Sequence, residues 1–560
     1  MSAEISEVAA VGGKFLGAGP VAMIVEIPMS ASSHENLSAA MPSERGRVAA
    51  SFPCRVWAGI SRWIGDESGT PSRMGKLWWL RLLVALGLAA LLIPIGRLRL
   101  IDGDEGYYLQ AARLVSEGKR VYTDFFYPQM PFGAHVYAAW FWLWGRGWYC
   151  ARLLSSLLAV GTGLLLLEIL LRTCGRKRWA ILGVALYLAT GLGVGWFSIA
   201  KSFGLTAFLL SLGILLLEVA QTPLLVACGG LAFALAVECR LYVVVAFPCA
   251  LLFLLRRHGF SRRGLKLAMA LAAGALAGGL LLLPYVFRDW HNFYFGNWTY
   301  HSIREFGQSG FITNLPNKKE TLLSILYLDR ERLPGSLQFL GLTAAALWAL
   351  LSPFSSHNRI TSYLWLALFL TSLIPSPTLP QYFCLLIPLL VVEAVVTLAS
   401  LRAWKAWSLV AALAIPYLIL GARDLKRYTT TGEAVPGVWT QDRVVRWTIP
   451  TVLTVAQKID AAGKPVGASW WPGYFVTTRT PLISTLANDF GLRAAPRLPP
   501  RERRRFGIVT HDEVAGMMDQ HDPPLFVVGN WAAWPAAGYL PKKGYRLVDS
   551  FKNASIYVAP

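Results

Sequence analysis

Long apolar segments recur along this chain and limit the folds that are open to it. Most approach the roughly 20 residues that an α-helix needs to cross the hydrocarbon core of a bilayer. Only 15% of the residues are charged, whereas soluble proteins carry about 25%. The sequence therefore predicts a mainly α-helical, polytopic membrane protein with about 11 transmembrane helices. The segments are residues 77–96, 151–171, 179–195, 202–219, 223–238, 241–255, 265–285, 336–352, 360–375, 382–400 and 404–421.

Basic residues orient these segments in the membrane. A formal charge of +21 would suggest a nucleic-acid partner in a soluble protein, but membrane proteins collect Lys and Arg in their cytoplasmic loops. The basic loops at 172–178 and 256–266 are separated by four predicted spans, so both can be cytoplasmic. We therefore expect no nucleic-acid partner and a multi-pass protein of the cytoplasmic (inner) membrane. Its N-terminus lies in the cytoplasm, and its loops at 97–150 and 286–335 lie outside.

Three regions follow from composition. Residues 1–73 are rich in Ala, Ser and Gly with little periodicity, which predicts disorder or an overextended start before Met74. Residues 74–425 form the predicted transmembrane domain. Residues 430–560 alternate short helical and strand patterns, which predicts a small soluble α/β domain outside the membrane. Its predicted helices are 452–462 and 511–520, its strands 464–471, 525–529, 545–551 and 554–558, and its linker 496–505.

Three carboxylates, Asp102, Asp104 and Glu105, follow the first apolar segment directly. One interpretation is a capping box, with Asp102 as N-cap and Glu105 three residues later. The other is chemical. Asp104 would lie near a helix N-terminus, which favours its ionised form, and an ionised carboxylate can accept a proton from a hydroxyl. Two adjacent carboxylates could also hold a divalent cation, but one loop offers few ligands, so we assign no metal site.

The rest of this loop is aromatic. Tyr122 and Asp124 lie in a stretch that mixes ring faces suited to sugars with polar groups suited to hydroxyls, although an ordinary aromatic belt has the same composition. Residues 131–145 are apolar but short for a span and dense in Trp, Phe and Tyr. We place them along the outer membrane surface; the alternative is a twelfth crossing.

One set of residues resembles a known N-terminal signature. The pattern is similar to that of C-type (GT-C) glycosyltransferases, and closest to the family of protein O-mannosyltransferases, the lipid A aminoarabinose transferase and bacterial galacturonosyl transferases. The resemblance implies a polyprenyl-phosphate sugar donor and a reaction on the outer face. It also implies Asp104 as general base with Glu105 beside it. The matching residues are Asp104-Glu105, Tyr108, Ala111-Ala112, Gly118, Tyr122-Thr123-Asp124-Phe125, Pro128, Pro131, Gly145 and Arg152-Leu153.

The chain departs from this pattern in places. Tyr127-Pro128-Gln129-Met130-Pro131 stands where mannosyltransferases have a His-Pro-Pro run, which leaves the sugar and acceptor open. Gln381 replaces the basic residue that often precedes a tyrosine, here Tyr382, at a late helix start. Lys201 stands where an acidic residue is common.

Ionisable residues within or beside membrane spans are costly and often functional. Lys201 and Arg240 could hold the phosphate of a lipid-linked donor. The alternatives are snorkelling for Lys201 and a local ion pair with Glu238 for Arg240. In the second outer loop, His291 and His301 lack the spacing of metal ligands. Lys318-Lys319 is interpreted as a solvated face, and the alternative is a contact with anionic headgroups or an acidic acceptor.

These features predict an enzyme. It would transfer a sugar from a polyprenyl-phosphate donor to a glycan, lipid or protein acceptor, with inversion at the anomeric carbon. The alternatives are a lipid-linked sugar flippase or other transporter, and a polysaccharide polymerase or ligase. We expect Asp104 and Glu105 to be catalytic. We expect substrate to be bound by Asp102, Tyr108, Tyr122, Asp124, Lys201, Arg240 and Tyr382.

Overall fold

The computed structural model describes most of the chain after residue 76. The predicted N-terminal region 1–73 lies outside the described residues, as do parts of the second outer loop. The described ranges are 77–220, 222–304, 314–326, 333–351, 359–401, 403–430, 448–529, 536–552 and 554–560.

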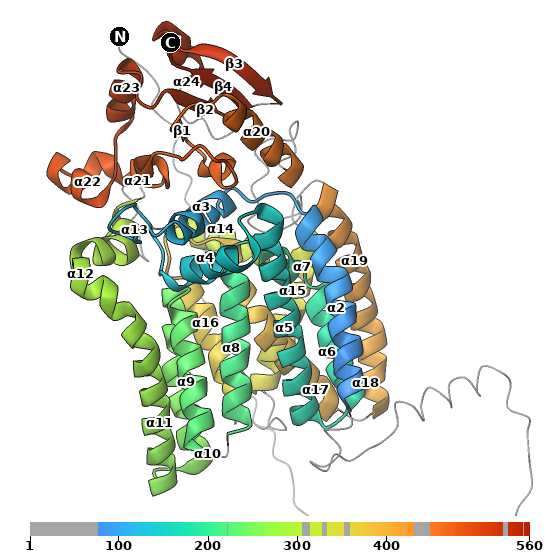
Figure 1. The fold of residues 1–560 in the computed structure, drawn as a ribbon. Helices are drawn as coiled ribbons and strands as arrows, with labels where there is room; N and C mark the ends of the chain where they lie inside the picture. The colour runs from blue at the N-terminus through green and yellow to red at the C-terminus, as the bar shows by residue number, and fades with distance from the viewer. Residues whose placement is uncertain are drawn as a thin grey trace, which may run out of the picture. The chain divides into compact units, whose positions relative to one another are not determined.

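A bundle of apolar helices forms most of the molecule (Figure 1). Within the described ranges, six helical segments are long and apolar enough to cross a membrane, and a bent pair would make a seventh. Four shorter apolar helices complete the set. Every predicted apolar segment overlaps one of these helices, which confirms the predicted polytopic helical fold.

The bounds of these segments are close to those predicted. The long ones are α2 Trp78–Leu98, α5 Trp148–Cys174, η2 and α10 Leu241–His258, Arg262–Ile303 (α11 to α13), η6 and α17 Pro380–Ser400, and Lys405–Ala422 in α18 to α19. The bent pair is α6 Lys177–Ala189 with α7 Gly191–Phe197, and the shorter helices are α8 Ser202–Glu218, α9 Pro223–Val237, Leu337–Leu351 in α15, and α16 Ile360–Ser372.

Small residues allow the closest helix contact of this bundle. A β-carbon on Gly274 of α11 would lie 1.9 Å from the Ala227 carbonyl oxygen of α9, and one on Gly230 would lie 2.4 Å from the Leu271 carbonyl oxygen. Both positions therefore require glycine. Such contacts are a common source of packing energy between membrane helices, where lipid removes the hydrophobic drive for association.

Two short helices lie across one end of the bundle (Figure 1). They are α3 Glu105–Ser116 and α4 Phe132–Trp144. Helix α4 has 13 residues and is not among the candidate spans, as expected for the aromatic segment 131–145. Its last residues, Trp142 to Trp144, are exposed and apolar, which suits a helix in the membrane interface.

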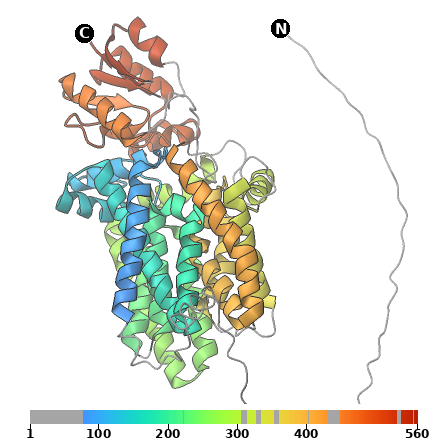
Figure 2. The same cartoon turned by 90° about the vertical axis from the view of Figure 1, so that its right-hand side faces the viewer.

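A small mixed sheet forms the C-terminal unit, beyond the bundle end that carries α3 and α4 (Figure 2). Its strand order is β1-β2-β4-β3, with β1 parallel to β2 and the other pairs antiparallel. The strands are β1 Gly467–Ser469, β2 Leu525–Val528, β3 Arg546–Phe551 and β4 Ala554–Val558, and the helices include α20 Ile449–Ala461, α23 His511–Asp519 and α24 Ala536–Lys542.

The segment 496–505, which we predicted as a linker, is partly helical. Helix α22 runs from Pro500 to Phe506, with a proline at its start and Gly507 in the left-handed conformation at its end. The Phe506 ring stacks on Phe295 with centroids 3.8 Å apart. The charges and prolines of this segment favour a loop. A short helix forms there nevertheless, and its last residue, Phe506, packs against Phe295.

Trp471 joins the C-terminal unit to the loop before α3. Its Nε1 donates to the Gly103 carbonyl oxygen at 2.7 Å, and its ring stacks on Trp148 of α5. A β-carbon on Gly106 would lie within 2.9 Å of both Trp471 and Gly473, so glycine is needed for this close approach. The carboxylate loop is thus covered by a distant part of the chain.

We expect Trp471→Phe to destabilise this junction. The substitution keeps an aromatic ring but leaves the buried Gly103 carbonyl without its donor, which costs about 1–3 kcal/mol. Thermal unfolding of the purified protein in detergent measures the loss. Trp142→Phe, at an 81% exposed position, is the matched control. Equal melting temperatures for the two variants would contradict the proposed role of Trp471.

Candidate active site

The loop between α2 and α3 is closed by short-range hydrogen bonds. The Asp102 N–H donates to Glu105 Oε2 at 2.9 Å, and the Asp104 N–H donates to Asp102 Oδ1 at 3.1 Å. Because α3 begins at Glu105, the cap position falls to Asp104 and half of the predicted capping box forms. The local sequence thus folds the loop but leaves the Asp104 carboxylate available for other contacts.

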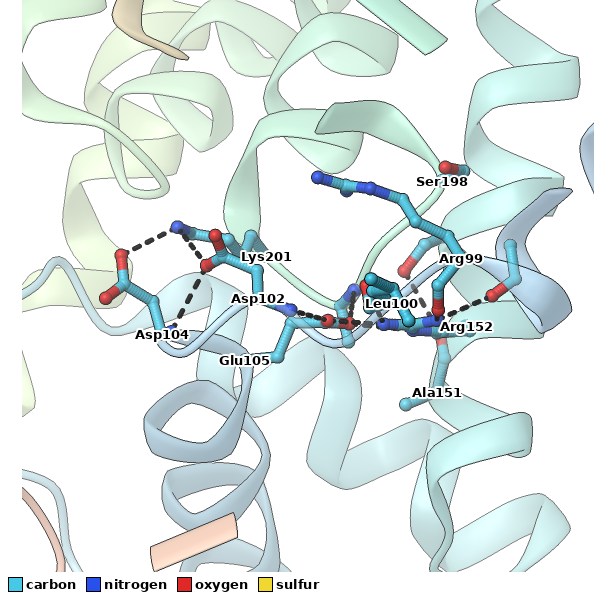
Figure 3. A network of polar contacts seen from close by, with 12 residues as sticks. Arg99, Leu100, Asp102, Asp104, Glu105, Ala151, Arg152, Ser198 and Lys201 are labelled. Atoms are coloured by element: carbon cyan, nitrogen blue, oxygen red, sulfur yellow. Dashed lines mark hydrogen bonds and ion pairs between the residues drawn. The ribbon is translucent and has the colours of Figure 1, made fainter. Parts of the chain in front are cut away.

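Glu105 is fully buried and committed to contacts within the protein (Figure 3). Arg152 of α5 donates from Nε to Oε1 at 2.9 Å and from Nη2 to Oε2 at 2.6 Å, and the Ala200 N–H donates to Oε1 at 2.9 Å. Burial opposes ionisation, but Arg152 outweighs it and the pKa of Glu105 is lowered. Glu105 therefore ties the loop to α5 and to the turn before α8.

Lys201 bridges the other two carboxylates (Figure 3). It precedes α8, and its side chain is 1% exposed. Its Nζ lies 2.9 Å from Asp102 Oδ1 and 2.6 Å from Asp104 Oδ2. The snorkelling alternative is therefore wrong, because the ammonium group points into the protein and is neutralised there.

Asp104 is the most accessible of the three carboxylates. Its side chain is 31% exposed, against 2% for Asp102. Burial raises the pKa of Asp102. For Asp104 the same burial effect is outweighed by Lys201, Arg240 and Arg493, so its pKa is lowered and the group is ionised at neutral pH. The loop thus presents one ionised carboxylate that is also accessible, that of Asp104.

Arg240 brings a second cation to the same place. It lies between α9 and η2, is 8% exposed, and donates from Nη2 to Tyr108 Oη at 3.0 Å. Its guanidinium lies over the Phe203 ring, 3.9 Å from the centroid. In the described part of the chain, no carboxylate pairs with it and its buried Nε lacks a hydrogen-bond acceptor. The predicted alternative, an ion pair with Glu238, does not form.

Tyr382 joins this group from a later part of the bundle. It lies in η6 Pro380–Leu386, where the sequence predicted a helix start. Its ring centroid is 6.1 Å from that of Tyr242, whose hydroxyl donates to the Tyr382 carbonyl oxygen at 3.3 Å. Burial opposes ionisation of Arg240, but Tyr108, Tyr242 and Tyr382 outweigh it and raise its pKa. The structure therefore brings Tyr108, Arg240 and Tyr382 together near Asp104.

Two predicted substrate-binding residues make other contacts. The Tyr122 hydroxyl donates to the Gln129 carbonyl oxygen at 2.6 Å and accepts from Asn297 Nδ2 at 3.0 Å. The Asp124 carboxylate pairs with Arg120 at 2.7 Å. These contacts shape the outer loop, and their assignment to substrate binding stays a prediction.

Lys318 corrects a further expectation. It is buried rather than part of a solvated face, and its Nζ donates to the Leu373 carbonyl oxygen at 2.7 Å and to Thr378 Oγ1 at 3.1 Å. It therefore fastens α14 Leu315–Ile325 to the segment after α16. Within the described ranges, no cluster of three or more His, Cys, Asp or Glu side chains is placed to hold a metal ion.

The sequence did not point to three neighbours of this site. One is Tyr107 of α3, whose neighbour Tyr108 was the tyrosine that we predicted to bind substrate. The other two, Asp489 and Arg493, lie in the C-terminal unit. Both Asp489 and Arg493 are near enough to α3 to shift pKa values there. No sequence signal could have linked Asp489 or Arg493 to this site, because some 385 residues separate them from Asp104.

The helical bundle, the outer loop with its carboxylates and the small C-terminal sheet define a polytopic membrane protein of the ArnT-like GT-C fold. The chain is similar to ArnT from Cupriavidus metallidurans bound to undecaprenyl phosphate, with a TM-score of 0.61 and 15% identity over 86% of this chain and 98% of that one. The apo state of that ArnT gives a TM-score of 0.58 and 17% identity, with the same coverage.

A weaker match is to the archaeal oligosaccharyltransferase AglB from Archaeoglobus fulgidus in complex with an inhibitory peptide and a dolichol-phosphate. Its TM-score is 0.49, with 12% identity over 87% of this chain and 74% of that one. No protein-family model matches the sequence, and no curated protein sequence does. The likeness to ArnT therefore establishes the fold alone.

The two adjacent carboxylates should respond differently to loss of charge. Glu105→Gln leaves Arg152 buried without its counter-ion, which should cost about 3–5 kcal/mol of stability. Asp104→Asn leaves Lys201 paired with Asp102, so we expect a loss within about 1 kcal/mol. Thermal and denaturant unfolding of the two variants, compared with the unsubstituted protein, measures both. Equal destabilisation would contradict the separate roles.

Proposed function

We propose that this protein is a membrane glycosyltransferase that transfers a sugar from a polyprenyl-phosphate donor to a hydroxyl of a glycan, lipid or protein acceptor. The fold it shares with ArnT supports the proposal, and that ArnT was crystallised with undecaprenyl phosphate. The basic loops 172–178 and 256–266 support a reaction on the outer face of the cytoplasmic membrane, with the C-terminal unit also outside.

The observation that carries the proposal is the buried Arg240. A buried charge is costly unless it is paired, and no carboxylate of the described residues pairs with Arg240. A phosphate supplies the missing anion and an acceptor for the unpaired Nε. Tyr108 and Tyr382 are near enough to Arg240 to act on its pKa, and their hydroxyls can donate to the same phosphate. The site thus suits an anionic leaving group next to the ionised Asp104.

The proposed reaction is a direct displacement. The acceptor oxygen attacks the anomeric carbon, the bond from that carbon to the phosphate oxygen breaks, and the acceptor proton passes to Asp104. The polyprenyl phosphate leaves with its charge stabilised by Arg240. Because the pKa of Asp104 is low, it accepts the proton after bond formation has made the hydroxyl strongly acidic. A single displacement inverts the anomeric centre.

Glu105 and Lys201 act in this scheme by positioning. Glu105 holds the loop against α5 through Arg152, and Lys201 fixes the Asp104 carboxylate at 2.6 Å. Asp102 shares Lys201 and so sets where its ammonium group lies. Fixing the base before substrate binds reduces the reorganisation that the reaction requires.

Asp104→Asn should abolish transfer while the protein stays folded. Amide nitrogen and oxygen cannot take the acceptor proton, so the rate should fall about 100-fold or more. The protein is reconstituted in proteoliposomes with radiolabelled polyprenyl-phosphate sugars and endogenous acceptors extracted from native membranes. The measurement is the transfer of radiolabel from the donor to these acceptors. Glu320→Gln, an exposed carboxylate of the second outer loop, is the control. Full transfer by Asp104→Asn would contradict its role, and translocation of the labelled lipid without transfer would indicate a flippase.

Arg240→Gln should weaken binding of the lipid phosphate. A charge-assisted hydrogen bond contributes about 1.5–3 kcal/mol, so the Kd for undecaprenyl phosphate should rise about 10- to 100-fold. Quenching of intrinsic tryptophan fluorescence measures this Kd. Arg288→Gln, an exposed arginine of α12 Leu283–Tyr294, should bind normally. An unchanged Kd in Arg240→Gln would remove the main support for the donor site.

A further inference from the structure

Residues 493–505 of the C-terminal unit contain six arginines and one glutamate. Basic residues of membrane proteins ordinarily collect on the cytoplasmic side, whereas the proposed topology places this arginine segment outside. Its net positive charge there requires an explanation. Arg501 and Arg504 are exposed, and no carboxylate of the described residues pairs with either. The segment lies on α21 Gly491–Ala494, η10 Ala495–Arg497 and α22 Pro500–Phe506.

Tertiary contacts hold the arginine segment against the second outer loop. The Phe506 ring, directly after the segment, stacks on Phe295 with centroids 3.8 Å apart. Asn292 Nδ2 donates to the Arg505 carbonyl oxygen at 3.2 Å. Both partners belong to the helical stretch Arg262–Ile303, a candidate membrane span. The arginine segment therefore lies by the end of that span which is opposite the basic loop 256–266 (Figure 1).

One face of α22 turns toward this end of the span. At 3.6 residues per turn, positions 501, 504 and 505 lie within an arc of about 100° on the helix. Arg505 of this face pairs with Asp289, with Nη2 and Oδ1 3.1 Å apart. Asp289 has a non-helical backbone and marks the kink within α12. Arg501 and Arg504 are therefore presented on the same face as the contact with the membrane helix.

Exposed aromatic rings lie on the helical stretch that carries these contacts. Trp290, Tyr294 and Trp298 are exposed and follow one another at intervals of four residues. The rings of Trp290 and Tyr294 stack with centroids 5.5 Å apart, so the two share one side of α12. Exposed tryptophan and tyrosine rings at the end of a span are typical of the headgroup layer of a bilayer.

Arginines next to aromatic rings at the end of a span fit a membrane surface with negative charge. We propose that Arg501 and Arg504 bind the phosphates of anionic phospholipids, with the rings of Trp290, Tyr294 and Trp298 in the headgroup layer. A net positive face is attracted to lipids with a net negative charge, and much less to zwitterionic ones. The proposal does not depend on the proposed function.

This contact would attach the C-terminal unit to the bilayer at a second place. Trp471 holds the unit to the loop before α3 through the Gly103 carbonyl oxygen. Arg493 belongs to the arginine segment and helps to lower the pKa of Asp104. The lipid composition of the leaflet would thus bear on how firmly the unit covers the carboxylate loop.

The test measures amide hydrogen exchange of α22 by mass spectrometry, with the whole chain reconstituted in nanodiscs. One set of nanodiscs contains phosphatidylcholine alone, and the other contains phosphatidylcholine and phosphatidylglycerol in equal parts. We expect exchange to be about 10- to 30-fold slower in the mixture, because each arginine near an anionic surface contributes a factor of about five. About 1 M NaCl, at which the Debye length is about 3 Å, should remove the difference.

The double substitution Arg501→Gln with Arg504→Gln should abolish the difference between the two lipid compositions and leave exchange in phosphatidylcholine unchanged. The matched control, Lys542→Gln with Arg546→Gln, removes two exposed cations of α24 and β3 in the same unit and should keep the difference.

Equal exchange of α22 in the two kinds of nanodisc would overturn this inference, as would an undiminished difference in the variant that lacks both arginines. Slower exchange in phosphatidylcholine nanodiscs on addition of inorganic phosphate or soluble polygalacturonate would also overturn it. That result would indicate a site for a soluble anion or an acidic glycan instead of a lipid surface.

Discussion

The buried ion pair between Glu105 and Arg152 fixes the geometry on which the candidate site depends. Two charges removed from water are stable only when each other and further hydrogen bonds satisfy them. Arg152 meets this condition with the Glu105 carboxylate and with the carbonyl oxygens of Gly96 and Leu100, at 2.9 and 3.1 Å. The end of α2, the start of α3 and the N-terminal half of α5 are thereby held together. With the Glu105 carboxylate used so fully for structure, its neighbour Asp104 is the carboxylate that stays accessible.

The site lies where three parts of the chain meet. The first outer loop supplies the carboxylates, the turns before α8 and η2 supply Lys201 and Arg240, and the C-terminal unit supplies Asp489. The two cations of the site differ in their partners. Lys201 pairs with Asp102 and Asp104, whereas Arg240 lacks a carboxylate partner in the described part of the chain. An arrangement with one satisfied and one unsatisfied cation suits a protein that must bind an anion next to a base.

Several elements could be predicted because their causes are local. The apolar segments form helices because their composition and length alone place them in lipid rather than in water. The Asp102–Glu105 turn forms from hydrogen bonds within four residues. Other expectations failed where long-range contacts decide. Lys201 pairs with Asp102 and Asp104, about 100 residues earlier, instead of reaching the membrane surface. Lys318 is buried against carbonyl oxygens some 55 residues later.

The sequence by itself determined the helical membrane architecture and drew attention to the carboxylate loop, because both are runs of neighbouring residues. Tertiary structure alone decided which carboxylate is accessible, since Asp104 and Glu105 are adjacent and of one chemical kind. It also decided that Arg240 lacks the partner that Glu238 offered two residues away, and that Asp489 lies next to Tyr107. Each of these depends on where separate helices bring their side chains, and burial and pairing there exist only once the chain has folded.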